Sequence, residues 1–173
     1  STALNAQEKD YAHEKAIEVL NAAVARRRLC AQILDTDLGA YHRVRYDLPS
    51  PVPKVSVIIP TKDRIDLLGT CLEGLQKKTD YKNLEIIIVD NNSAEARTFE
   101  YLEMIEREDN VRVIKFPHDF NFSAINNFAA SKAIGEILVL LNNDIEVIKP
   151  DWLTELVSHA NRPGIGAVGG RLY

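Results

Sequence analysis

Short runs of mainly apolar, often β-branched residues recur along the chain, and segments with helical character separate them. The runs lie at 55–59, 84–89, 111–116 and 136–141, and the helical segments are expected at 65–78, 94–107, 123–133 and 151–160. Continuous apolar strands joined by crossover helices are typical of a parallel sheet covered on both faces. The pattern predicts an α/β fold with a Rossmann-like, open, mostly parallel sheet, because such crossovers are right-handed. A further strand is expected to begin within 164–172.

The first third of the chain has a different character. Residues 5–34 contain no Gly or Pro and are rich in Ala, Glu, Lys, Leu and Arg, which favours one long amphipathic helix. Residues 41–53 include Pro49, Pro51 and Pro53, which predict an extended linker because proline disfavours helix. We therefore divide the chain into a helical extension (1–40), a Pro-containing linker (41–54) and an α/β domain (55–173).

Three consecutive arginines, 26–28, lie in the C-terminal half of the predicted N-terminal helix. Cations there suit the helix macrodipole, so a solvated face is the simpler interpretation. A basic amphipathic helix is also a candidate for peripheral association with an anionic membrane, and its apolar stripe is a candidate surface for self-association.

Charge and cysteine content exclude several classes of protein. Lys plus Arg is 21 and Asp plus Glu is 25, a weakly acidic balance that argues against a nucleic-acid partner. Cys30 and Cys71 form neither a C-x-x-C pair nor a disulfide framework, which favours a reducing, cytoplasmic compartment, including the inner face of the cytoplasmic membrane. No apolar run approaches the roughly 20 residues that span a bilayer, and no signal peptide is evident.

Clusters of polar residues follow three of the predicted strands, where parallel sheets bind their ligands. They read Pro-Thr-Lys-Asp-Arg at 60–64, Asp-Asn-Asn-Ser at 90–93 and Asn-Asn-Asp-Ile-Glu at 142–146. Neither G-x-G-x-x-G nor G-x-x-x-x-G-K-[ST] is present, so the usual dinucleotide and P-loop sites lose support. Oxygen ligands at Asp144, with Asn142 or Glu146 nearby, suit Mg²⁺ or Mn²⁺, which can bridge phosphates. The strand exits therefore predict a site for a divalent cation and a diphosphate.

Each cluster taken alone also has a purely structural interpretation. Residues 90–93 can form a turn and helix cap, and residues 142–144 an ordinary loop. Thr61 and Asp63 can cap the helix that begins near residue 65. His118 has no second His or Cys at ligand spacing, which favours a surface histidine. The functional interpretation depends on the joint occurrence of all the clusters.

Three blocks of sequence together resemble the family 2 glycosyltransferases, which have the GT-A fold. They are Val-Ser-Val-Ile-Ile-Pro-Thr-Lys-Asp-Arg at 55–64, Glu-Ile-Ile-Ile-Val-Asp-Asn-Asn-Ser at 85–93, and the segment from Asn126 to Asp144 that ends in Leu-Leu-Asn-Asn-Asp. Phe-Asn-Phe-Ser-Ala-Ile-Asn-Asn-Phe at 120–128 resembles bacterial enzymes that build O-antigen, capsule or rhamnose-containing glycans. The resemblance covers 55–173 and implies a truncated GT-A sheet.

The resemblance implies a nucleotide site at the strand exits. Pro60 and Thr61 would line the nucleoside pocket, and Arg64 would lie near the base or the phosphates. Asp90 would accept a hydrogen bond from the imide N–H of uracil or thymine, since a carboxylate only accepts. Asn127 falls on the helix that faces the nucleotide. These roles imply a UDP-sugar or dTDP-sugar donor.

The resemblance also places a D-x-D-like motif at 142–144. Asp144 would be the ligand of Mn²⁺ or Mg²⁺, Asn143 would contact the nucleotide, and Asn142 stands where a carboxylate is usual. An amide oxygen at Asn142 can still bind the cation but adds no charge, so cation binding is expected to depend more on the donor's diphosphate.

The activity implied is metal-dependent, inverting transfer of a hexosyl group to a glycan or lipid-linked acceptor in bacterial surface polysaccharide synthesis. The resemblance places the catalytic base beyond Tyr173, so the chain by itself is expected to be inactive in transfer. A non-catalytic GT-A-like module that binds a nucleotide or a partner is the alternative. A receiver-like signalling domain fits poorly, because Pro-His-Asp at 117–119 follows the third strand where a phosphoacceptor Asp is expected.

Overall fold

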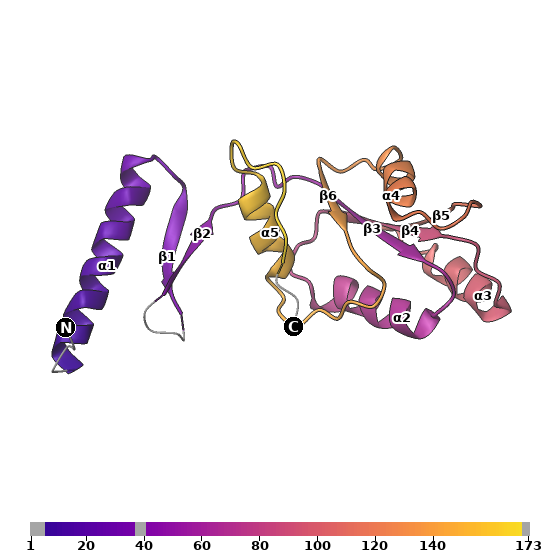
Figure 1. Cartoon of the computed structure of the whole chain (residues 1–173), viewed down its shortest axis with the longest axis horizontal. Coiled ribbons are helices and arrows are strands. Elements are labelled where there is room, and N and C mark those ends of the chain that lie inside the picture. Colours follow the sequence, from indigo (N-terminus) through magenta and orange to yellow (C-terminus); the bar gives the residue numbers. More distant parts are fainter. Residues whose placement is uncertain (1–5, 37–40, 171–173) are drawn as a thin grey trace. The chain divides into compact units, whose positions relative to one another are not determined.

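A computed structural model of the chain describes residues 6–36 and 41–170, with side chains from residue 11 onward (Figure 1). The chain divides into two compact units, one made of Pro49–Thr154 and the other of Ser1–Leu48 together with Glu155–Tyr173. No helix in the described part of the chain is both long enough and apolar enough to cross a membrane.

A four-stranded sheet forms the centre of unit Pro49–Thr154. Its strands are β3 (Val55–Thr61), β4 (Leu84–Asp90), β5 (Val111–Lys115) and β6 (Ile137–Leu140). They lie in the order β5-β4-β3-β6, and every pairing is parallel. This confirms the predicted Rossmann-like parallel sheet, with each strand within one residue of its expected bounds at either end except β3, which continues to Thr61.

Helices cover both faces of this sheet. They are α2 (Ile65–Glu73), followed by a five-residue π-helix (Gly74–Lys78), α3 (Ala96–Ile105) and α4 (Phe122–Ala130). Figure 1 shows α4 on one side of the sheet and α2 and α3 on the other. The core under α4 joins strand residues Ile58, Ile87 and Val89 to Ile125 and Ala129 of the helix, all fully buried. Because each central strand is buried on both faces, its middle is an apolar run in the sequence, at 57–59 in β3 and 86–89 in β4.

The strand register brings the predicted strand exits to one edge of the sheet. Thr61 pairs with Asp90, and Asp90 pairs in turn with Lys115. On the other side of β3, Ile58 pairs with Leu140, so the segment that begins at Asn142 leaves the sheet beside the end of β3. Residues far apart in the sequence therefore meet at the carboxyl edge.

The amino edge of the same sheet is closed by a buried carboxylate. Glu85, only 3% exposed, accepts hydrogen bonds from Ser56 Oγ at 2.5 Å and from the Ile134 N–H at 2.7 Å. Arg112 Nη1 lies 3.3 Å from the other carboxylate oxygen. Burial opposes ionisation of Glu85, yet these hydrogen bonds and the guanidinium charge together hold the pKa of the carboxyl below its ordinary value.

The N-terminal helix is shorter than the composition predicts. Helix α1 is Ala6–Arg26 and does not continue to residue 34. Two residues after its end, Arg28 has a φ of 52°, in the left-handed region that commonly terminates helices. Without a glycine at this position, the sequence does not signal the end of the helix.

Two antiparallel strands follow, where a helix end and a linker were predicted. β1 (Ala31–Asp35) pairs with β2 (His42–Tyr46). The prediction of an extended linker from residue 41 is therefore wrong for β2, which is part of a hairpin, while 47–54 forms no helix or strand. The alternation of Arg43, Val44 and Arg45 is a period-2 signal that could have indicated the strand.

The hairpin contacts residues of the last helix, α5 (Trp152–Ala160), that belong to the same unit. The Arg43 guanidinium donates to both carboxylate oxygens of Glu155, at 3.0 and 2.5 Å. This contact lowers the pKa of Glu155. The ring of Tyr46 packs edge-on against His159, with ring centroids 5.1 Å apart. The guanidinium of Arg162 lies over the same Tyr46 ring, 4.1 Å from its centroid.

The strand predicted within 164–172 is absent over its described part, residues 164–170. Four of these seven residues are glycines, and a Cβ built on any of them would meet no atom within 4 Å. Strand formation needs a neighbouring backbone, which this segment lacks.

Candidate functional site

A cavity of about 500 Å³ opens at the carboxyl edge of the sheet. Its lining comes from the exits of β3, β4 and β6 and from the segment after β5: Pro60, Thr61, Lys62, Arg64, Leu67, Asn91, Asn92, His118, Asp119, Phe120, Asn143 and Asp144. The volume lies in the range of small-molecule sites. The lining is mainly polar, with basic, acidic and amide side chains that can hold a charged, hydrogen-bonding ligand.

Five of the eight residues that the sequence assigns to a nucleotide or metal site line this cavity. They are Pro60, Thr61, Arg64, Asn143 and Asp144. Asn143 Nδ2 donates to Thr61 Oγ1 at 3.1 Å, and this bond joins the exit of β6 to the exit of β3. The structure therefore brings together two strand exits that are 82 residues apart in the sequence.

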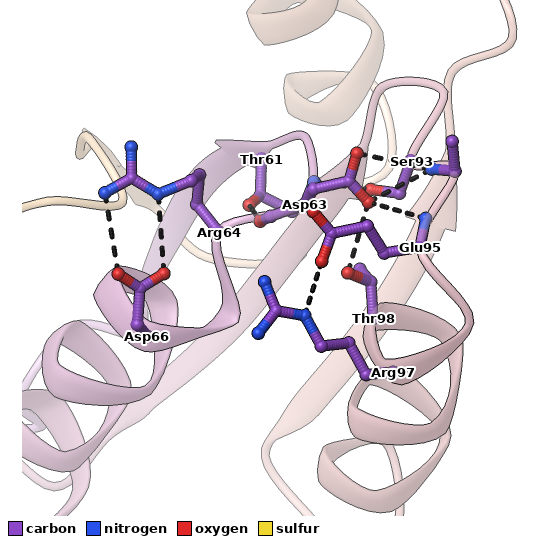
Figure 2. A network of polar contacts seen from close by, with 9 residues as sticks. Thr61, Asp63, Arg64, Asp66, Ser93, Glu95, Arg97 and Thr98 are labelled. Carbon is purple, nitrogen blue, oxygen red and sulfur yellow. Dashed lines mark hydrogen bonds and ion pairs between the residues drawn. The ribbon is translucent and has the colours of Figure 1, made fainter.

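The turn after β3 has an unusual backbone. Asp63 and Arg64 both have φ of 53°, in the left-handed region that non-glycine residues rarely adopt. Figure 2 shows how the turn is held: Asp63 Oδ1 accepts hydrogen bonds from the N–H groups of Ala94 and Glu95, both at 3.0 Å, and from Thr98 Oγ1 at 3.2 Å.

Asp63 therefore caps α3, across the sheet edge. The sequence had suggested that it caps α2, the helix that directly follows it. The Glu95 N–H bond is the main influence that lowers the pKa of Asp63. The Asp63 N–H also donates to Ser93 Oγ at 2.8 Å. These bonds fix the turn and leave the Arg64 side chain at the cavity, where it faces Asp66 at 3.4 Å (Figure 2).

The exit of β4 forms the turn that its sequence allows. Asp90 is 4% exposed, and its Oδ1 accepts a hydrogen bond from the Ser93 N–H at 3.0 Å. Asp90 does not belong to the cavity lining, whereas its neighbours Asn91 and Asn92 do. The turn predicted for 90–93 is thus present, but the residue at the N-cap of α3 is Glu95, outside this segment. A contact of Asp90 with a base stays a prediction.

The buried asparagine of helix α4 is Asn126, and not Asn127, which the sequence assigned to the nucleotide site. Asn127 is exposed and does not line the cavity. Asn126 is 5% exposed; its Nδ2 donates to the Phe122 carbonyl at 2.8 Å, and its buried Oδ1 has no hydrogen-bond partner. Sequence position alone could not distinguish the two residues, because adjacent residues on a helix point about 100° apart.

The D-x-D-like segment places one carboxylate at the cavity. Asp144 lines it and is exposed, whereas Asn142 is exposed but lies outside the lining. The Asn142 carbonyl accepts from Cys71 Sγ at 3.7 Å, and burial raises the pKa of that thiol to about 11. Within the described residues, Asp144 belongs to no group of three His, Cys, Asp or Glu ligands. One carboxylate beside amide groups fits a hard cation whose other ligands come from solvent and from a bound ligand.

One wall of the cavity was not predicted. It is formed by His118, Asp119 and Phe120, which follow β5, and it is held in place by the two residues that follow β4. Asn91 Nδ2 donates to the Phe116 carbonyl at 3.0 Å and to the His118 carbonyl at 2.8 Å, and Asn92 Nδ2 donates to the latter at 3.0 Å. The predicted parallel sheet could have indicated this wall, because the segment after the third strand must leave the sheet at the same edge as the other strand exits.

Two relatives match nearly the whole chain. An uncharacterised protein, y4gI, of Sinorhizobium fredii is 41% identical over 100% of this chain and 19% of its own length. The O-antigen biosynthesis protein RfbC of Myxococcus xanthus is 42% identical over 94% of this chain and 12% of its own length. The chain thus spans less than a fifth of either relative.

Solved glycosyltransferases have a similar fold. The mannosyltransferase PcManGT from Pyrobaculum calidifontis, in complex with GDP-Man and Mn²⁺, matches 90% of this chain and 43% of its own with a TM-score of 0.60 and 21% identity. TarS of S. aureus, residues 1–349 in complex with UDP, matches 62% of this chain and 32% of its own with a TM-score of 0.51 and 24% identity. The family model for glycosyl transferase family 2 matches residues 56–173, which include the parallel sheet except its first residue, Val55, and every lining residue of the cavity, and the chain therefore belongs to that family.

Proposed function

We propose that the cavity at the carboxyl edge binds the nucleoside diphosphate of a UDP-sugar or dTDP-sugar, together with Mn²⁺ or Mg²⁺. The proposal rests on one observation above all: Thr61, Arg64, Asn143 and Asp144, from two strand exits, line one polar cavity in a family 2 glycosyltransferase. It gives the region 55–173 the role of a donor-binding domain.

The lining residues divide by chemistry into two groups. Lys62, Arg64 and His118 can donate to phosphate oxygens, and the Arg64 guanidinium can do so with two N–H groups. Pro60 and Leu67 provide apolar surface for a base or ribose. Thr61 Oγ1 and Asn143 Nδ2 are already aligned by their mutual hydrogen bond and can contact a ribose hydroxyl without reorganisation.

Asp144 is the proposed protein ligand of the cation, with Asn142 and Asn143 as neighbouring amides. A cation at this position would neutralise negative charge on the diphosphate as it leaves the sugar. Because Asp144 belongs to no group of three protein ligands among the described residues, the cation and the diphosphate are expected to bind together. The neighbour PcManGT holds GDP-Man with Mn²⁺, which supports such joint binding.

For the whole protein we propose inverting transfer of a hexosyl group to a glycan or lipid-linked acceptor of a bacterial surface polysaccharide. The kinship with RfbC, named for O-antigen biosynthesis, supports this substrate class. The catalytic base is proposed to lie outside residues 1–173, so that these residues bind the donor and do not transfer the sugar. Asp90 is proposed to accept a hydrogen bond from the pyrimidine of the donor, and Asn127 to face the nucleotide.

The test is a calorimetric titration of the chain with UDP, dTDP and GDP, each with and without Mn²⁺. We expect UDP or dTDP to bind best, and Mn²⁺ to tighten binding by about 10-fold or more, which corresponds to about 1.4 kcal/mol. Asp144→Asn should abolish the effect of Mn²⁺ and leave the cation-independent binding in place, because it removes charge with little change of shape.

Glu146→Gln is the matched control, since Glu146 is an exposed carboxylate two residues away that pairs with Lys78 at 3.3 Å outside the lining. In the Glu146→Gln variant, Mn²⁺ should still tighten nucleotide binding. The donor-site proposal fails if no nucleotide binds, or if Asp144→Asn and Glu146→Gln respond to Mn²⁺ alike. A preference for GDP would contradict the role of Asp90 in recognising a pyrimidine.

A further inference from the structure

Two histidines and an aspartate from three separate elements converge in the unit that contains the N-terminal hairpin. His13 lies on α1, Asp35 ends β1, and His42 begins β2. Asp35 Oδ1 is 3.1 Å from His13 Nε2 and 3.4 Å from His42 Nδ1. One ligand atom from each residue lies within 4.8 Å of the other two. The glycosyltransferase proposal makes no use of this cluster.

The His42 ring carries an unsatisfied nitrogen. Its side chain is 9% exposed, and Nδ1 is buried with no hydrogen-bond partner. The Asp35 oxygen is within ion-pair distance at 3.4 Å, but the contact does not have hydrogen-bond geometry. A buried nitrogen without a hydrogen-bond partner lowers the stability of the fold. A ligand bound to His42 Nδ1 would therefore explain the orientation of the His42 ring better than the ion pair with Asp35 does.

The distances suit a transition-metal ion. Zn²⁺ with bonds of about 2.0–2.1 Å to nitrogen and oxygen in a tetrahedral arrangement requires ligand atoms about 3.3 Å apart. Both Asp35 contacts, at 3.1 and 3.4 Å, already have this separation. The two imidazole rings lie 4.8 Å apart between centroids and tilt by 38°, so both can direct a nitrogen at one point.

The geometry points to a binding site for Zn²⁺, or a similar transition-metal ion, made by His13, Asp35 and His42. Two imidazoles and one carboxylate form a ligand set that proteins use for zinc. Asp35 is 64% exposed, so water can occupy the fourth position. The alternative is a cluster held by hydrogen bonds and charge alone, which would leave His42 Nδ1 unsatisfied.

The site would have a structural consequence. From residue 11 to its end, α1 has no fully buried side chain, so apolar packing holds it only weakly against the hairpin. A metal ion bound by His13 and by both strands would join the helix to the hairpin, and its binding free energy would become folding free energy. This ion therefore orders the N-terminal extension.

The experiment titrates the full chain, freed of metal, with Zn²⁺ by calorimetry and with Co²⁺ by visible absorption, where a tetrahedral site gives characteristic d–d bands. We expect one Zn²⁺ per chain. His13→Gln and Asp35→Asn should weaken Zn²⁺ binding by at least about 100-fold, since loss of an outer-shell partner alone costs about 10- to 100-fold. Both residues are partly exposed, so these variants are expected to fold.

His159→Gln is the matched control, because His159 lies in the same unit but pairs with Glu155 at 3.5 Å. It should bind Zn²⁺ as the unchanged chain does. The inference is overturned if the unchanged chain binds no Zn²⁺, or if His13→Gln and Asp35→Asn bind it as tightly as His159→Gln. Asp144→Asn should leave Zn²⁺ binding intact, so failure of the nucleotide proposal and failure of this one are distinguishable.

Discussion

The two edges of the parallel sheet contain the same kinds of residue and use them in opposite ways. At the amino edge, the Glu85 carboxylate is buried and accepts from Ser56, Ile134 and Arg112. At the carboxyl edge, the Asp144 carboxylate is exposed and lines a cavity. The difference shows that charged residues next to a strand do not by themselves indicate a binding site.

What separates the two edges is whether the side chains at the edge are buried or lie exposed at a cavity. Gly135 comes so close to β3 that its N–H donates to Ser56 Oγ at 2.8 Å, and no room for a ligand remains. At the other edge, Asp63 and Arg64 form a turn with left-handed backbone angles, and the Arg64 side chain lies exposed at the cavity. The amino edge stabilises the fold, and the carboxyl edge is free to bind a ligand.

The largest effect on stability is expected from Gly135→Ala. A Cβ there would lie 2.5 Å from the Ser56 nitrogen and 2.6 Å from its Oγ, so the backbone of β3 or of the loop must move. We expect a loss of about 3 kcal/mol of unfolding free energy. Urea unfolding followed by the fluorescence of Trp152, the one tryptophan, measures it. Gly166→Ala is the control, with no atom within 4 Å of its Cβ, and an equal loss in both variants would contradict the close-packed edge.

A smaller effect, with a dependence on pH, is expected from Glu85→Gln. Removal of the charge should cost about 2 kcal/mol at neutral pH, because hydrogen bonds to an ionised acceptor are lost. The folded-state pKa of Glu85 lies below the ordinary 4.5, so its contribution is present above pH 4.5 and is lost as the pH falls through the folded pKa.

The urea midpoints of the unchanged chain and of Glu85→Gln should therefore converge below pH 4.5. Both proteins keep Asp63 and Glu155, whose pKa values are also lowered, so these contributions cancel in the difference. Midpoints that stay parallel down to acidic pH would show that the charge of Glu85 does not stabilise the amino edge.

The smallest effect on stability is expected at the carboxyl edge, from Thr61→Val. It removes the hydroxyl that bonds Asn143 and should cost at most about 1 kcal/mol. Nucleotide affinity should fall by about 10-fold, because the aligned pair at the cavity is lost. Thr154→Val, which removes a bond to Asp80 outside the lining, is the control for titration. A large loss of stability with unchanged affinity would reverse the roles of the two edges.

Much of the sheet could be predicted from the sequence because its determinants are local. A strand buried on both faces is mainly apolar on both, and β3 and β4 have this pattern at 57–59 and 86–89. The hairpin was missed because Ala31–Asp35 continues the helix-favouring composition of α1 and becomes a strand only through its pairing with His42–Tyr46. Tertiary pairing overrides local propensity in such segments.

The candidate site was predictable in part for the same reason. Polar residues after apolar strands predicted Thr61, Arg64, Asn143 and Asp144 at one edge, and the cavity contains them. The wall at 118–120 depends on side-chain bonds from Asn91 and Asn92 to backbone carbonyls of another loop, which no local pattern encodes.

By itself, the sequence determined the alternation of strands and helices and the polar strand exits, since burial imposes a short-range periodicity on residue type. The tertiary structure decided which groups meet. It assigned Asp63 to the cap of α3, left Asn127 outside the cavity and brought His13 to Asp35 and His42. Such meetings depend on strand register and on backbone turns like that at Arg64, where contacts between distant residues select a conformation that local sequence does not favour.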